Sequence, residues 1–149
     1  MIKKIDLKNS EQAKEVLQLQ ISAYKVEAEL IEYDAIPPLK DTIETLQQTD
    51  ELFYGIYEQN ELFGAISIKI DHHIMDIHRL VVHPKNFRKG YAQMLLDFIE
   101  KEFIVDKIIV STGCKNLPAV SFYKKNQFRL VREALIENRL KLCYFEKLI

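Results

Sequence analysis

The stretch that decides the fold reads Leu80-Val-Val-His-Pro-Lys-Asn-Phe-Arg-Lys-Gly-Tyr-Ala-Gln-Met-Leu-Leu96. A β-branched apolar run ends at His83-Pro84, a short basic loop follows, and an amphipathic segment begins after Gly90. This order predicts a strand, a loop and a helix. The first N–H groups of a helix lack partners, and the positive end of its dipole faces whatever lies in front. With Arg88 and Lys89 beside this helix start, the pattern favours binding of a phosphate or pyrophosphate, and hence of a nucleotide-like cofactor. An ordinary loop with two solvated basic residues is the plainer alternative.

Composition limits the classes of protein to consider. The chain has 149 residues, of which 48% are hydrophobic, so we expect one globular domain over residues 1–149. The formal net charge is −1, which argues against a general nucleic-acid binder. The sequence contains no apolar run of the roughly 20 residues that cross a bilayer, and its first residues do not resemble a signal peptide. We therefore expect a cytoplasmic protein with neither a membrane nor a nucleic-acid partner.

The side chains that bind metals are few and scattered. Cys114 and Cys143 lack a CxxC spacing, so we expect both thiols to be free and reduced, and Cys114 to be a small buried residue in place of a reactive thiol. Four histidines fall within twelve residues, but no cysteine or carboxylate cluster accompanies them, and no metal site is expected. These histidines are His72, His73, His78 and His83.

Hydrophobic periodicity, prolines and turn residues give the order of elements. The pattern predicts β-α-α-β-β-β-α-β-α-β-β, which is one α/β domain with a mixed sheet. Strands are expected at Met1–Leu7, Leu52–Tyr57, Leu62–Ile70, Ile74–Val82, Lys107–Val110, Gln127–Ala134 and Arg139–Phe145, and helices at Ser10–Leu30, Asp41–Gln48, Gly90–Phe103 and Asn116–Asn126.

Two motifs in this order resemble the GNAT superfamily of N-acetyltransferases. The acetyl-CoA loop of that family follows Arg/Gln-x-x-Gly-x-Gly/Ala, and here the corresponding segment is Phe87-Arg-Lys-Gly-Tyr-Ala92. A second family pattern, Asn-x-x-Ala-x-x-Phe-Tyr-x-x-x-x-Phe, is matched by Asn116-Leu-Pro-Ala-Val-Ser-Phe-Tyr-Lys-Lys-Asn-Gln-Phe128. The first motif alone is weak, whereas the pair, separated by the expected helix and strand, is specific. The resemblance implies a GNAT-like α+β fold, in which helices flank a mixed, mostly antiparallel central sheet.

The resemblance also implies the cofactor site. Backbone groups of Leu80 and Val82 should pair with the pantetheine arm of acetyl-CoA, and Asn116 should contact that arm. The pyrophosphate should be held by the loop amides, so these residues form the expected pyrophosphate site: Arg88, Lys89, Gly90, Tyr91 and Ala92.

The sequence departs from the family pattern at two positions. Phe87 stands where Arg or Gln is usual, so the backbone amides around Gly90 should carry more of the binding. Asn126 stands where Gly often precedes the closing Phe, and Asn tolerates a left-handed conformation better than most residues.

The implied reaction is direct transfer of the acetyl group to a primary amine within a ternary complex. Tyr123 is the expected acid that protonates the thiolate leaving group, with a core aromatic as the alternative. Asp76 is the expected base because its place before Gly90 resembles that of the glutamate base in the histone-acetylating branch. A solvated carboxylate is equally compatible with its position. His78 and an ordered water remain alternatives.

Acceptor recognition is expected between residues 24 and 40, where Tyr33 and Asp34, with Glu29 and Glu32, would make an acidic mouth for a cationic small-molecule, peptide or protein amine. Closing strands in this fold often pair between subunits, which leaves a homodimer open. A non-catalytic acyl-CoA-binding or regulatory module on the same fold is the alternative function. A P-loop enzyme is disfavoured, because the chain lacks the Gly-x-x-x-x-Gly-Lys-Ser/Thr pattern.

Overall fold

The computed structural model describes residues 1–33, 35–136 and 140–149. The order of the helices and strands matches the one that the sequence predicts. The elements are β1 (Ile2–Lys4), α1 (Ser10–Ile31), the 3-10 turn η1 (Pro37–Lys40), α2 (Ile43–Gln47), β2 (Leu52–Glu58), β3 (Glu61–Asp71), β4 (Ile74–Val82), the 3-10 turn η2 (Pro84–Asn86), α3 (Tyr91–Glu102), β5 (Lys107–Gly113), α4 (Leu117–Lys125), β6 (Arg129–Ile136) and β7 (Leu140–Leu148).

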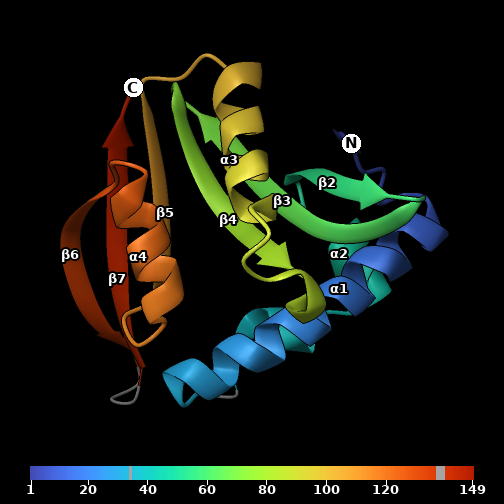
Figure 1. Cartoon of the computed structure of the whole chain (residues 1–149), viewed down its shortest axis with the longest axis horizontal. Coiled ribbons are helices and arrows are strands. Elements are labelled where there is room, and N and C mark those ends of the chain that lie inside the picture. The colour runs from blue at the N-terminus through green and yellow to red at the C-terminus, as the bar shows by residue number, and fades with distance from the viewer. Residues whose placement is uncertain (34, 137–139) are drawn as a thin grey trace.

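The strands form one sheet in the order β1-β2-β3-β4-β5-β7-β6. Neighbouring strands are antiparallel except β4 and β5, which confirms the mixed, mostly antiparallel sheet. In Figure 1, α3 lies over β3 and β4, and α4 lies over β5 and β7. Two clusters of buried side chains pack on the sheet, one with α3 and α4 and the other with α1 and α2. The sheet is thus covered on both faces.

The limits of α1 follow from its sequence. The side chain of Asn9 accepts hydrogen bonds from the N–H groups of Glu11 at 3.0 Å and Gln12 at 3.2 Å, as an N-cap residue does. The helix ends at Ile31, after which Glu32 adopts a left-handed conformation with φ 56°. The prolines that follow form η1 in place of more α-helix, because proline lacks the N–H that a helix interior needs.

The strands β4 and β5 separate part-way along the sheet. Their parallel pairing spans Ile74–Ile77 and residues 107–110, while β4 continues to Val82. Opposite β3, His78 is an extra residue between two paired positions, so β4 carries a bulge there. Past Val110, β5 continues to pair with β7. The result is a V-shaped opening, which Figure 1 shows toward the end of the sheet where α1 crosses.

Helix α1 closes this opening through a close backbone approach at Gly113. A Cβ atom at Gly113 would lie 2.6 Å from Cγ2 of Ile31, so a larger residue would push the helix away. This strand end falls outside the Lys107–Val110 segment that the sequence predicts, because Ser111 and Thr112 carry no apolar signal and extend the strand by pairing with β7. The first strand is shorter than predicted, β6 begins and ends later, and β7 ends later, while its predicted start at Arg139 falls outside the described residues.

The turn after α4 differs from its predicted conformation. Asn126 has φ −96°, and the left-handed residue is Gln127, with φ 67°. The side chain of Asn126 is used otherwise: it donates to the carbonyl of Phe122 at 2.8 Å and accepts from Gln93 of α3 at 2.7 Å. The polar amide at this position therefore ties α4 to α3.

Candidate active site

A cavity of about 480 Å³ lies where β4 and β5 diverge. Its walls come from α1, η1, the ends of β4 and β5, the start of α4 and β7. Segments from both halves of the chain meet here, as α1 lies near the N-terminus and β7 forms the end of the sequence. The cavity is large enough for a small organic molecule.

Tyr123 and Asn116 both line this cavity, as their predicted roles require. Tyr123 is 5% exposed, and its ring contacts those of Phe128 and Phe145 at centroid distances of 5.3 and 6.0 Å. Burial raises the pKa of its hydroxyl, and the negative charge of Glu27 adds to that effect. Tyr123 therefore keeps its proton at neutral pH, so it is able to act as a donor, although a raised pKa makes it a weaker acid.

Asn116 is the N-cap of α4. Its side-chain oxygen accepts a hydrogen bond from the N–H of Ala119 at 3.3 Å, and its Nδ2 donates to Oε1 of Glu27 at 2.9 Å. Asn116 is 7% exposed, so both contacts are made away from bulk water. The residue that the family resemblance assigned to the cofactor arm thus also joins α4 to α1.

Glu27 is a functional candidate that the sequence reasoning did not name. It lies on the inner face of α1, lines the cavity, and is partly buried. Burial raises the pKa of its carboxyl, and the hydrogen bond from Asn116 opposes this rise without cancelling it. Tyr24 lines the cavity one turn earlier on the same helix, and its pKa is raised by burial first and by the charge of Glu27 second.

Two carboxylates and a side-chain amide surround Arg79 of β4. The guanidinium donates to Oε1 of Glu51 at 3.0 Å, to Oδ2 of Asp41 at 2.7 Å and to the side-chain oxygen of Gln20 at 2.9 Å. Gln20, in turn, donates to the same Asp41 oxygen at 2.8 Å. The guanidinium of Arg79 is thus shared between two carboxylates and is, within residues 1–33, 35–136 and 140–149, the arginine or lysine that lines the cavity.

The predicted bases Asp76 and His78 lie next to each other on β4. His78 lines the cavity, whereas Asp76 does not. Nε2 of His78 is 3.4 Å from Oδ2 of Asp76, and Nδ1 is 4.0 Å from Oε2 of Glu51. Burial raises the pKa of Asp76, and the charges of His78 and Lys69 work against the rise. Asp76 therefore reaches the cavity through His78.

The predicted pyrophosphate loop leads into the N-terminus of α3. Gly90 is the N-cap residue of α3 with φ 82°, and Arg88 is also left-handed with φ 64°. Tyr91 begins the helix, and its hydroxyl donates to Glu58 at 2.6 Å, which fixes the side chain away from a ligand role. Phe87 is 45% exposed and leaves the loop without a polar side chain at that position. The amides of the first helical turn are the groups that an anion would meet.

The predicted pantetheine edge lies in the opening between the strands. Leu80 and Val82 pair with Ile66 and Gly64 of β3, and both lie past the last residue of β4 that pairs with β5. Leu80 lines the cavity. A strand edge that is released from its neighbour is able to pair with an extended ligand.

The described residues of the predicted acidic mouth do not line the cavity. Asp34 falls outside the described residues, and Tyr33 packs against the cluster under α1 without lining the cavity. Glu29 is exposed, and Glu32 forms an ion pair with Lys115 at 2.8 Å on the surface. Other residues of the same region line the cavity, because helical spacing places Tyr24, Glu27 and Ile31 together on the inner side of α1.

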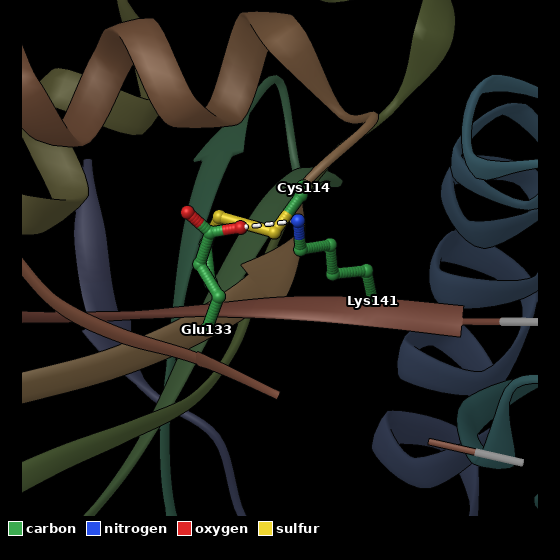
Figure 2. Close-up of a disulfide and its surroundings, with 4 residues drawn as sticks. Cys114, Glu133 and Lys141 are labelled. Atoms are coloured by element: carbon green, nitrogen blue, oxygen red, sulfur yellow. Dashed lines mark ion pairs between the residues drawn. A yellow bond between two sulfur atoms is a disulfide. The ribbon is translucent and has the colours of Figure 1, made fainter. Parts of the chain in front are cut away.

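The prediction of two free thiols is wrong, because Cys114 and Cys143 form a disulfide. Their Cα atoms are 5.2 Å apart, since the N–H of Cys114 bonds to the carbonyl of Lys141 and holds the end of β5 beside β7. Figure 2 shows the ion pair between Glu133 and Lys141 next to the sulfur atoms, at 2.8 Å. Cys114, Glu133 and Cys143 are the described residues with the spacing of a metal site, and two of these three ligands are bonded to each other.

The comparisons with known proteins agree with this geometry. The sequence pattern of the acetyltransferase (GNAT) family matches residues 13–128. The chain belongs to this family. Membership confirms the resemblance stated from the two motifs and places the domain among the acyltransferases. Among the described residues, every helix is too short or too polar to cross a bilayer.

A curated relative and two solved structures are similar over nearly the whole chain. UPF0157 protein YqkA of Bacillus subtilis (strain 168) is 38% identical over 146 residues, which are 97% of this chain and 43% of the relative. The chain thus spans less than half the length of that relative. The PaiA N-acetyltransferase of Thermoplasma acidophilum in complex with coenzyme A has a TM-score of 0.77 at 20% identity, covering 100% of this chain and 98% of the other. The ribosomal-protein-S18-alanine N-acetyltransferase of Escherichia coli has a TM-score of 0.77 at 14% identity, covering 100% and 93%. At these identities the structures support the fold.

Proposed function

We propose that the protein is an acetyl-CoA-dependent N-acetyltransferase that acts on a primary amine by direct attack in a ternary complex. The observation that carries this proposal is the cavity at the divergence of β4 and β5, whose lining includes Tyr123 and the carboxylates of Glu27, Asp41 and Glu51. A negatively charged cavity suits an acceptor that arrives as an ammonium ion. The opening between the strands and the start of α3 supply the two features that a CoA thioester needs.

The residues present fit the cofactor in a simple way. The pantetheine arm would lie along the free edge of β4 at Leu80 and Val82 and pass Asn116. The pyrophosphate would meet the amides from Arg88 to Ala92, and the side chains of Arg88 and Lys89 would add positive charge nearby. The loss of a polar side chain at Phe87 moves the recognition onto the backbone.

Tyr123 would supply the proton that the departing thiolate needs. Aromatic neighbours fix the ring and so set the direction of the hydroxyl. The hydroxyl itself takes no part in these ring contacts. The raised pKa keeps the hydroxyl protonated until the thiolate forms. A pure binding module has no need for a buried phenol at this position.

Two measurements test the proposal. Acetyl-CoA should raise the melting temperature, because a ligand at 100 times its Kd adds about 2.7 kcal/mol to the stability of the folded state. A panel of primary amines should then release free thiol from acetyl-CoA above the rate without enzyme. If acetyl-CoA causes no thermal shift, the proposed cofactor is wrong. A thermal shift without thiol release from any amine would favour the non-catalytic acyl-CoA-binding module.

A further inference from the structure

We propose that Glu27 binds the ammonium group of the acceptor and takes a proton from it, so that α1 supplies the base of the reaction. This inference rests on the proposed function and goes beyond it, because it assigns the base and the charge of the substrate. The acceptor class is an aliphatic primary amine that is cationic in solution.

The contacts of Glu27 leave its charge uncompensated. Its one hydrogen-bond partner in the described part of the chain is the neutral amide of Asn116, at 2.9 Å. The other two carboxylates that line the cavity, Asp41 and Glu51, share Arg79. A buried carboxylate normally pairs with a cation, because the loss of hydration is costly. A cationic ligand would supply the missing partner.

The position of Glu27 also fits a base better than that of its competitors. Glu27 and Tyr123 line the same cavity, and the charge of Glu27 adds to the effect of burial, which raises the pKa of the Tyr123 hydroxyl. Asp76 lies behind His78, outside the cavity lining. Glu27 is therefore the cavity carboxylate whose charge acts on the proposed acid and that Arg79 does not hold.

The proton balance links the two residues. The ammonium gives one proton to Glu27, and the neutral amine forms the N–C bond with the thioester carbonyl carbon. When the C–S bond breaks, Tyr123 gives its proton to the sulfur, and the second proton of the nitrogen restores the Tyr123 hydroxyl. Burial keeps the pKa of Tyr123 raised throughout, but proton uptake by Glu27 removes the second cause, its negative charge, so the acid becomes stronger as the base is used.

The cavity surroundings favour a compact aliphatic amine. Apart from the carboxylates, its wall includes Ile31, Leu80, Leu140 and Leu142, which would pack against a carbon chain. The other ionisable groups around it lie on several elements: Tyr24 on α1, Tyr123 on α4, His78 and Arg79 on β4, Asp41 after η1, and Glu51 before β2. Among the cations, Arg79 is held by two carboxylates, which leaves Glu27 as the site for the incoming charge.

The test compares Glu27→Gln with Glu15→Gln, which makes the same change on the same helix about 18 Å along its axis. Glutamine keeps an oxygen for the hydrogen bond from Asn116 and removes the charge and the base. We expect kcat/KM for aliphatic amines to fall about 10²–10⁴-fold in Glu27→Gln, with loss of the acidic limb of its pH profile. Aromatic amines, which are neutral at pH 7, should lose less. Glu15→Gln should behave as the wild type.

The thermal shift with acetyl-CoA separates the outcomes. It should persist in Glu27→Gln, which shows that the variant is folded and that the cofactor site is intact. If the wild type turns over amines and Glu27→Gln retains its rate and pH profile, the assignment of Glu27 is overturned while the proposed function stands. If the wild type turns over no amine, both the proposed function and the assignment of Glu27 fail. Equal losses for aliphatic and aromatic amines would overturn the role as base.

Discussion

The carboxylate of Glu27 on α1 accepts a 2.9 Å hydrogen bond from Nδ2 of Asn116, the residue that caps α4. The two residues are 89 positions apart in the sequence. The helices α1 and α4 belong to different core clusters, and this hydrogen bond crosses the opening between β4 and β5 to join them. The side chain of Asn116 thus holds both Glu27, the proposed base, and α4, the helix that carries Tyr123.

Replacing Asn116 by alanine should destabilise the protein and disturb Glu27. Loss of an N-cap side chain costs about 1 kcal/mol, and leaving a buried acceptor without its donor costs about 1–3 kcal/mol more. Urea unfolding measures the sum. Asn116→Ser is the matched control, because its hydroxyl is able to cap α4 without reaching Glu27. It should therefore recover the stability that comes from the N-cap and not the part that comes from the contact with Glu27. Equal stabilities for the two variants would contradict the contact with Glu27.

Glu27→Gln should be more stable than the wild type at neutral pH. Because the pKa of Glu27 is raised above its ordinary value of 4.5 in the folded state, that state binds the proton more tightly than the unfolded chain does. The stability that Glu27 contributes is therefore lost as the pH rises from about 4.5 through the raised pKa. The loss amounts to about 1.4 kcal/mol for each pH unit that separates the folded-state pKa from the unfolded one. Glu27→Gln has no ionisable carboxyl at this position, so its stability does not fall in this way as the pH rises.

Melting temperatures across pH 3–8 measure the difference. The two proteins should melt alike below the ordinary carboxyl pKa and diverge as the pH rises. The other charged side chains around the cavity are present in both proteins, so the comparison isolates the change at position 27. A wild type that gains stability over the variant with rising pH would mean that Glu27 meets a cation in the free protein.

Tyr123→Phe should lower kcat and leave acetyl-CoA binding in place. The ring keeps its contacts with Phe128 and Phe145, so only the proton donor is removed. General acid catalysis contributes about 10²–10⁴-fold, and that is the expected loss where chemistry limits the rate. Tyr54→Phe is the control, since Tyr54 packs against Phe98 outside the cavity. An unchanged kcat in Tyr123→Phe, with chemistry rate-limiting, would remove Tyr123 from the mechanism.

The sequence predicts the fold well because its signals are local. The asparagine cap before α1, the proline pair after it and the glycine before α3 each act within a few residues. The resemblance carried by the family motifs then predicts the mixed, mostly antiparallel sheet. The limits of β5 were missed, since Ser111 and Thr112 become strand residues only through their pairing with β7.

The site is less predictable because its residues meet only in three dimensions. Glu27 has no motif around it, and its importance comes from burial beside Tyr123. The helical spacing of Tyr24, Glu27 and Ile31 could have indicated an inward face. The pairing of Cys114 with Cys143 depends on strand register, which spacing along the chain does not contain.

Gly90→Ala should weaken acetyl-CoA binding through the backbone. An added Cβ would meet no heavy atom within 4 Å, but φ is +82°, where an L side chain costs about 1–2 kcal/mol. The loop should relax and misalign its amides, so the thermal shift with acetyl-CoA should shrink. Gly90→Asn is the matched control, because asparagine tolerates this conformation better. A full thermal shift in Gly90→Ala would show that the loop amides are not needed for binding.

Reduction of the disulfide should lower the stability of the protein. The bond closes a loop between positions 29 apart in the sequence, and the entropy that such a loop loses in the unfolded chain is worth about 3–4 kcal/mol. For a chain of this size we expect a fall in Tm of roughly 10 °C on adding dithiothreitol.

The double variant Cys114→Ser and Cys143→Ser is the control for this experiment. It should melt like the reduced wild type and show no response to reductant. If the wild type melts at the same temperature with and without dithiothreitol, the disulfide is contradicted and the two thiols are free, as their spacing predicts. Because Cys114 lies two residues before Asn116, thiol release by the reduced enzyme should be followed in parallel. Full activity after reduction would show that β5 and β7 hold Asn116 in place by their pairing alone.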